Sequence, residues 1–131
     1  MRIPADQVSS PTYNVDLAQA TVELCERDLG GVYHLVGDGV MDRLAFARIA
    51  CEVFDLDPSR LTAVTTAQLG QKAARPLKGG LRIAKAQGVL ATPLRSPEAG
   101  LRAMRKALEG RAAAAGGAGA DASPERGRVR G

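Results

Sequence analysis

Apolar and polar residues recur along this chain with periods that predict short helices and strands. From Val15 to Asp28, apolar residues return every three or four positions, which predicts an amphipathic helix with Asn14 as its N-cap and Asp16 in its first turn. Its apolar face is expected to hold Leu17, Ala18, Val22, Leu24 and Cys25. Residues 32–36, rich in β-branched and aromatic side chains between glycines, predict a strand.

Three elements follow from the same patterns at the start and in the middle of the chain. Residues 2–7 predict a short strand that leads into a polar turn at residues 8–11. Asp42 is expected to cap a second helix. The inward residues of that helix are predicted to be Leu44, Ala47, Ile49, Ala50 and Val53 or Phe54.

The rest of the chain predicts smaller elements and one further helix. In order, these are an extended segment at 61–64, a brief helix at 67–72 that Thr66 caps, a loop at 75–80 and a short segment at 81–86. Ser96-Pro97 predicts the start of the last helix, with Leu101, Met104 and Leu108 on one face, and Gly110 its end. The order of elements predicts an α/β fold with about four helices and too few strands for a complete doubly wound sheet.

Composition divides the 131 residues into one small domain and a tail. Residues 111–131 are mostly Ala, Gly and Arg, which predicts a disordered segment, and residues 1–110 are left to form the core. No signal peptide or membrane span is expected from the sequence. Cys25 and Cys51 lie far apart in apolar patterns, which predicts reduced core thiols and a cytoplasmic location; with one His in the chain, no metal site is expected.

Charge is distributed unevenly between the two halves. Residues 1–57 carry ten acidic and four basic residues, whereas residues 58–110 carry two acidic and ten basic ones. The basic half favours an anionic partner, either a phosphorylated small molecule, an acidic protein or nucleic acid. Nucleic acid is disfavoured because no aromatic residue follows Phe54.

No set of residues in the sequence predicts catalysis. The loop at 37–42 resembles the start of a dinucleotide-binding turn, but Asp42 stands where the third glycine would be and would repel a pyrophosphate. Neither Tyr13 nor Tyr33 has a Lys four residues later, and His34 lies in an apolar segment. Catalytic, metal and cofactor-binding residues are therefore predicted to be absent from this chain.

Arg75 is the strongest candidate for binding. Pro76 holds the preceding residue extended, and the surrounding sequence is basic. A guanidinium on such a loop suits bidentate recognition of a diphosphate, although an arginine in this position more commonly packs as a surface residue against a helix end.

Four short motifs then occur in a fixed order. They are D-Q-V-S-S-P-T at 6–12 with D-L-A at 16–18, G-V-Y-H-L at 31–35, F-A at 46–47, and A-R-P at 74–76 with Leu81. Together they resemble the dTDP-4-dehydrorhamnose reductase family over roughly residues 3–108. Ser9 and the K-G-G at 78–80 depart from the family pattern, which leaves the exact sugar open.

The resemblance implies both a fold and a function. The family consists of extended short-chain dehydrogenases that use NAD(P)H to reduce the 4-keto group of a dTDP-sugar in dTDP-L-rhamnose biosynthesis. Residues 1–110 would be the C-terminal, substrate-binding portion, truncated with respect to a cofactor-binding N-terminal half, and we expect this chain alone to be inactive. The residues implied to line the dTDP-sugar pocket are Asp6, Gln7, Pro11 and Thr12, with Arg75 at the diphosphate.

Two other interpretations of the chain stay open at this point. One is a non-catalytic binding or regulatory module, as in the methionine adenosyltransferase regulatory subunit of the same fold family. The other is a remnant that does not fold alone, because the first strand and helix would expose apolar faces that normally pack on the missing half.

Overall fold

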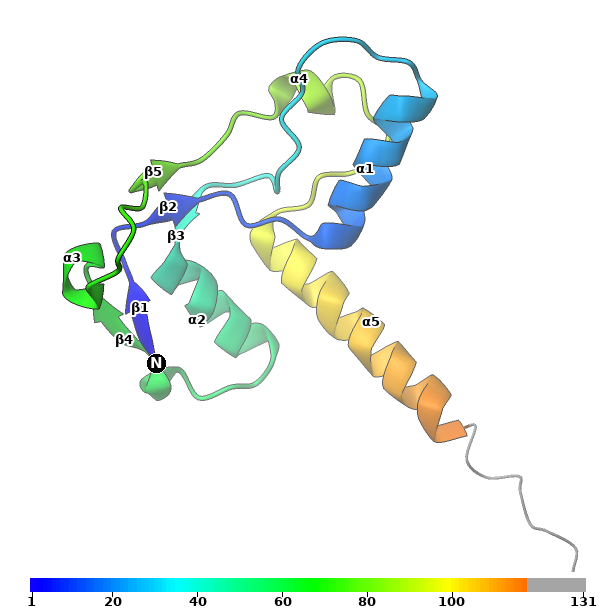
Figure 1. The fold of residues 1–131 in the computed structure, drawn as a ribbon. Coiled ribbons are helices and arrows are strands. Elements are labelled where there is room, and N and C mark those ends of the chain that lie inside the picture. Colours follow the sequence, from blue (N-terminus) through cyan, green and yellow to red (C-terminus); the bar gives the residue numbers. More distant parts are fainter. Residues whose placement is uncertain (118–131) are drawn as a thin grey trace, which may run out of the picture.

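Short strands alternate with helices along the chain, as the computed structural model, which describes residues 1–117, shows (Figure 1). The strands are β1 (Arg2–Pro4), β2 (Val8–Ser9), β3 (Met41–Asp42), β4 (Thr62–Val64) and β5 (Lys78–Gly79). The helices are α1 (Asn14–Glu26), α2 (Arg43–Val53), α3 (Thr66–Leu69), α4 (Ala84–Gln87) and α5 (Pro97–Gly117), with a 3₁₀ turn at Pro58–Arg60. The predicted mixed α/β class with few strands is confirmed.

Two small sheets connect the first residues of the chain to its middle. β1 pairs in parallel with β4, with Arg2 opposite Thr62. β2 is the central strand of a three-stranded sheet, antiparallel to β3 and parallel to β5. The turn predicted at residues 8–11 is thus partly a strand, and the segment between β1 and β2, which contains Asp6 and Gln7, lies where the two sheets meet.

The apolar side chains pack in two groups. Ala20 of α1, Ile83, Ala86 of α4 and Leu94 form a buried cluster, against which Tyr33, Leu35, Val36 and Leu90 pack. In the other group α2 buries Leu44, Cys51 and Val53 and packs on β1 and on α5. Figure 1 shows α1 and α4 side by side at one end, with α2 between β1 and α5 at the other.

The segment at residues 32–36 is not a strand, in contrast to the prediction. Among the described residues no strand pairs with it, and its alternate residues Tyr33 and Leu35 still face the cluster while Val32 is 76% exposed. A strand needs a neighbour to satisfy its backbone groups, so the β-type pattern alone does not form one.

The predicted inward face of α1 is also wrong. The residues buried by α1 are Asp16 and Ala20, whereas Leu17, Val22 and Cys25 are exposed. The inward face carries carboxylates that hydrogen-bond to the segment before α5, so apolar periodicity pointed to the wrong side. Cys51 is buried, as expected, and both cysteines are free.

The N-caps of α2 and α5 are predicted correctly. Asp42 caps α2 by accepting from the Ala45 N–H at 2.8 Å, and Ser96 accepts from the Ala99 N–H at 3.3 Å ahead of Pro97. The predicted caps Asn14 and Thr66 are wrong by one residue, because Tyr13 and Thr65 occupy those positions.

Two further boundaries differ from the predictions. α3 ends at Leu69, before Gly70 in a left-handed conformation with φ of 62°. α5 does not end at Gly110 but continues to Gly117, because the alanines that follow favour helix enough to offset one glycine. The predicted disorder therefore fails for residues 111–117, and residues 118–131 lie outside the described part. No helix in residues 1–117 is long and apolar enough to cross a membrane.

Candidate functional site

A cavity of about 460 Å³ lies beside the central strand β2. Its walls come from β2 and the loop after it, the first turns of α2, and the segment that leads into β5. The lining residues are Gln7, Val8, Ser9, Pro11, Arg43, Phe46, Arg75, Pro76 and Gly79. This described lining contains two arginines and no acidic residue, so we call it the arginine cavity.

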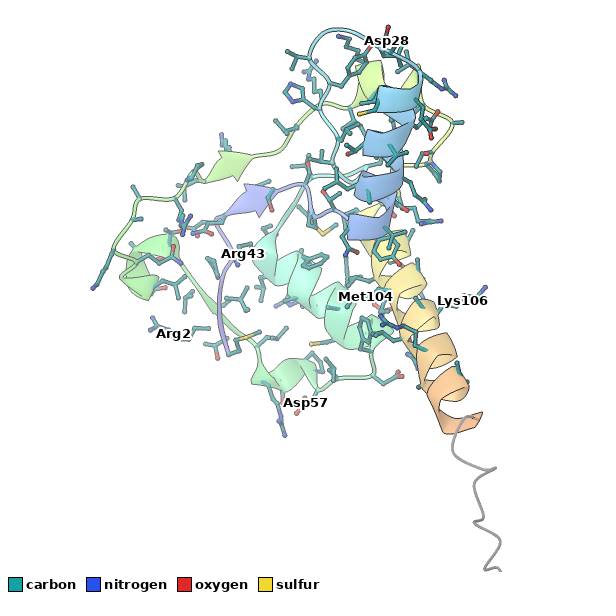
Figure 2. The ribbon with its side chains drawn as sticks, turned by 45° about the vertical axis from the view of Figure 1, so that its right-hand side comes forward. Arg2, Asp28, Arg43, Asp57, Met104 and Lys106 are labelled. Carbon is teal, nitrogen blue, oxygen red and sulfur yellow. The ribbon has the colours of Figure 1, made fainter. Side chains whose placement is uncertain are left out.

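Arg43 is held in this cavity by the residue that precedes β2. It is the first residue of α2 and follows the Asp42 cap directly. Figure 2 labels Arg43 at the start of this helix. Its backbone N–H donates to the Gln7 carbonyl at 3.1 Å, and its side-chain Nη1 donates to Gln7 Oε1, also at 3.1 Å. Gln7 thus fixes both the backbone and the guanidinium of Arg43.

Gln7 is itself anchored from behind. It is 6% exposed, and its Nε2 donates to Thr66 Oγ1 at 3.1 Å. The Asp6 carboxylate accepts from the Thr66 N–H at 2.9 and 3.0 Å and from the Thr66 hydroxyl at 2.7 Å. These hydrogen bonds from Thr66 hold the pKa of Asp6 below its ordinary value. Asp6 therefore supports the cavity without lining it.

Thr12 fastens the loop that forms another wall. Its hydroxyl donates to the Ser10 carbonyl and accepts from the Gly37 N–H, each at 3.0 Å. Gly37 lies so close to this loop that a Cβ there would be 2.1 Å from the Pro11 carbonyl oxygen. The glycine at residue 37 is thus needed for close packing against the loop at residues 11–12.

A second cavity, of about 270 Å³, adjoins the first. It shares Pro11 and Phe46 with the arginine cavity, and its other lining residues are Thr12, Tyr13, Asn14, Pro97, Gly100, Leu101 and Met104. Because this lining contains no charged side chain, we call it the apolar cavity. A ligand could place an anionic group in one cavity and an apolar group in the other.

The structure brings three of the five predicted residues to the arginine cavity. Gln7, Pro11 and Arg75 line it, Thr12 lines the apolar cavity, and Asp6 lies behind Gln7. Their role in binding stays a prediction. The sequence did not single out Phe46, which lines both cavities, as a site residue.

Arg43 was also missed, although one local signal was available. A cation in the first turn of a helix lies at the positive end of the helix dipole, which is unfavourable. Such a placement suggests that the side chain serves another purpose.

The loop at residues 37–42 does not fit the pyrophosphate of a nicotinamide dinucleotide. A helix N-terminus binds pyrophosphate through free backbone N–H groups, but at α2 the Asp42 carboxylate already accepts from the Ala45 N–H. The glycine at residue 37 is packed against Pro11 rather than open to a ligand. What these cavities offer chemically is the binding and orientation of an anion, since arginines pair bidentately with phosphates.

Known proteins are similar to this chain over part of their own length. The dTDP-4-dehydrorhamnose reductase of Mycobacterium tuberculosis is 39% identical over 93 residues, which cover 69% of this chain and 30% of that protein. The spore coat polysaccharide biosynthesis protein SpsK of Bacillus subtilis is 37% identical over 76 residues, 58% of this chain and 26% of that protein.

Solved structures agree with these similarities. The dTDP-4-dehydrorhamnose reductase of Bacillus anthracis, solved in complex with NADP, is 28% identical with a TM-score of 0.72, over 83% of this chain and 38% of that one. The Clostridium acetobutylicum reductase, at 23% identity and a TM-score of 0.75, covers 83% of this chain and 39% of its own, and shows the shared fold.

The chain spans about a third of the length of the curated relatives it matches, between 26% and 35% of each. Residues 1–109 match the family model described as the RmlD substrate binding domain, which confirms the family predicted from the sequence motifs. The chain therefore belongs to the RmlD substrate binding domain family.

Proposed function

We propose that this chain binds a dTDP-sugar as the substrate-binding portion of a dTDP-4-dehydrorhamnose reductase-like enzyme. The observation that carries the proposal is the arginine cavity, in which Arg43 and Arg75 line one space with no described acidic residue beside them. Two guanidiniums there suit the two phosphates of a nucleoside diphosphate. Relatives named dTDP-4-dehydrorhamnose reductase support the choice of dTDP-sugar as the substrate class.

The reduction itself is proposed to need a cofactor-binding part in addition to the described residues. The loop at residues 37–42 does not fit the pyrophosphate of the nicotinamide cofactor, so hydride transfer from NAD(P)H would require a cofactor-binding half beyond residues 1–117. In this arrangement residues 1–110 bind and orient the sugar nucleotide, and the complete enzyme acts in dTDP-L-rhamnose biosynthesis. A cytoplasmic location is proposed on the basis of the two free cysteines.

Isothermal titration calorimetry with dTDP tests the binding role directly. Arg75→Ala and Arg43→Ala should each weaken dTDP binding about tenfold or more, because a hydrogen bond to a charged group contributes about 1.5–3 kcal/mol. Arg60→Ala is the matched control, since Arg60 lies outside both cavities with its side chain 84% exposed. Equal affinity in all four proteins would contradict the proposed site.

A second candidate is a non-catalytic module that binds another protein. The observation that favours it is the exposure of apolar side chains on α1 and in the segment after it, with Val22 at 55% and Val32 at 76%. Exposed apolar side chains that gather in a patch are often covered by a partner. A well-dispersed amide NMR spectrum that does not change on addition of dTDP would favour this candidate over nucleotide binding.

A further inference from the structure

We propose that Thr66 is a positioning residue that orients the Arg43 guanidinium in the arginine cavity, acting through the side-chain amide of Gln7. Thr66 lines neither of the two cavities. The ligand class of this inference, a diphosphate, rests on the proposed function, whereas the positioning itself is a property of the unliganded protein.

The direction of three consecutive hydrogen bonds carries the inference. An ionised carboxylate only accepts hydrogen bonds, so the single hydroxyl proton of Thr66 goes to Asp6 Oδ1, 2.7 Å away. The Thr66 hydroxyl oxygen is then free to act as an acceptor, and it accepts a hydrogen bond from Gln7 Nε2 at 3.1 Å. With its nitrogen engaged there, Gln7 can turn only its oxygen toward Arg43.

This order matters because an amide has two ends of opposite character. A reversed Gln7 amide would turn N–H groups toward Arg43, and a guanidinium has no acceptor for them. The two groups would then face each other donor to donor. The Thr66 hydroxyl, fixed by Asp6, therefore selects the amide orientation in which Arg43 is held.

Burial makes this selection effective. Gln7 is 6% exposed, so water is not freely available to satisfy a reversed amide. Arg43, in contrast, is an exposed residue and lies at a cavity wall, where an unanchored guanidinium would sample many rotamers. One of the five guanidinium N–H donors is used by Gln7, and the others have no partner within residues 1–117 and are available to a phosphate.

The orientation of Arg43 is tested first without any ligand, by NMR on the full chain. In the wild type the Arg43 Nε–H group should give a ¹H–¹⁵N heteronuclear NOE typical of an ordered side chain. Thr66→Val removes only the hydroxyl and should lower this NOE, whereas Thr66→Ser restores the hydroxyl and should restore the NOE. Thr21→Val is the matched control, because the Thr21 hydroxyl bonds to Leu17 within α1. An unchanged Arg43 NOE in Thr66→Val would overturn the proposal.

Binding of inorganic diphosphate then tests the consequence. Thr66→Val should weaken it about threefold to tenfold in the wild-type background. It should have no effect in an Arg43→Ala background, because Thr66 acts through Arg43. An equal loss in both backgrounds would overturn the relay and indicate a general structural effect of Thr66.

A second variant keeps the proposal testable if Thr66→Val does not fold. Gln7→Met removes the amide while leaving the Thr66 and Asp6 hydrogen bonds in place, and it should disorder Arg43 to the same degree. A Gln7→Met protein with an ordered Arg43 Nε–H would overturn the inference. If the wild type itself does not bind diphosphate, the proposed function fails, while the NMR result still decides the role of Thr66.

Discussion

Asp16 in the first turn of α1 and Arg95, 79 residues later, form an ion pair whose carboxylate is almost fully buried. Asp16 Oδ1 accepts from Arg95 Nη1, and Asp16 Oδ2 accepts from the Arg95 backbone N–H at 3.2 Å. The Asp16 side chain is 2% exposed, against 38% for that of Arg95. Because Ser96 caps the next helix, this pair joins the start of α1 to the start of α5.

Replacing Arg95 should be among the most damaging single changes in the chain. Arg95→Met leaves the buried Asp16 carboxylate without its countercharge, and breaking a buried pair in this way costs about 3 kcal/mol. Urea unfolding followed by circular dichroism measures the loss. Arg102→Met is the control, since its pair with Glu98 is exposed on both sides and should contribute less than about 0.5 kcal/mol. Similar losses in both variants would show that burial of Asp16 does not matter.

Gly37 should not tolerate a side chain. The Cβ of Gly37→Ala would lie 2.1 Å from the Pro11 carbonyl oxygen and 3.2 Å from that of Arg95, both backbone atoms. The loop with Pro11 and Thr12 would have to move, at a cost of about 2 kcal/mol or more. Gly30→Ala has no atom within 4 Å of the new Cβ and should change stability by less than about 0.5 kcal/mol. Thermal unfolding of the two variants compares them, and equal midpoints would contradict the close approach.

Glu23 should make stability depend on pH in the acid range. Its carboxylate accepts from the Ala91 and Thr92 N–H groups at 2.7 and 2.8 Å, which lowers its pKa from 4.5 to about 2, with a smaller effect from Arg27. Because the pKa of Glu23 is lower in the folded state, its carboxylate stabilises the fold fully above pH 4.5, and this stabilisation is lost as the pH falls toward 2.

The matched variant for this prediction is Glu23→Gln, which keeps the shape and removes the charge. Denaturant unfolding between pH 2 and 7 gives the free energy of unfolding of each protein. This free energy should be higher for wild type than for Glu23→Gln near neutrality, and the two values should converge near pH 2. A constant difference across the whole range would mean that the Glu23 charge does not stabilise the fold.

Two features set by neighbouring residues were predictable from the sequence, whereas the cap of α3, which is also local, was predicted one residue too late. The Asp42 and Ser96 caps depend on N–H groups three residues away, and both are present where expected. Features that depend on residues distant in sequence were not predictable. The strand expected at residues 32–36 lacks a partner strand among the described residues, and the inward face of α1 is fixed by Asp16 and Glu23 bonding to residues 91–95.

The candidate site shows the same division. Arg75 was found because Pro76 and a basic neighbourhood mark it locally, and it does line the arginine cavity. Arg43 was missed because its anchor, Gln7, lies 36 residues away in sequence. Asp6 belongs to the same motif as Gln7 but faces Thr66, a contact 60 residues distant that sequence spacing could not indicate.

Phe46 should distinguish the nucleoside end of a ligand from its phosphate end. Phe46 lines both the arginine cavity and the apolar cavity, so we expect a base attached to a bound diphosphate to contact it. Phe46→Leu keeps an apolar side chain but removes the ring, and it should weaken dTDP binding about fivefold, since an aromatic contact contributes about 0.5–1.5 kcal/mol beyond its area. Inorganic diphosphate, which has no base, should bind both proteins equally in calorimetry. If Phe46→Leu weakened both ligands to the same degree, Phe46 would act by shaping the arginine cavity, and the base would have to bind elsewhere.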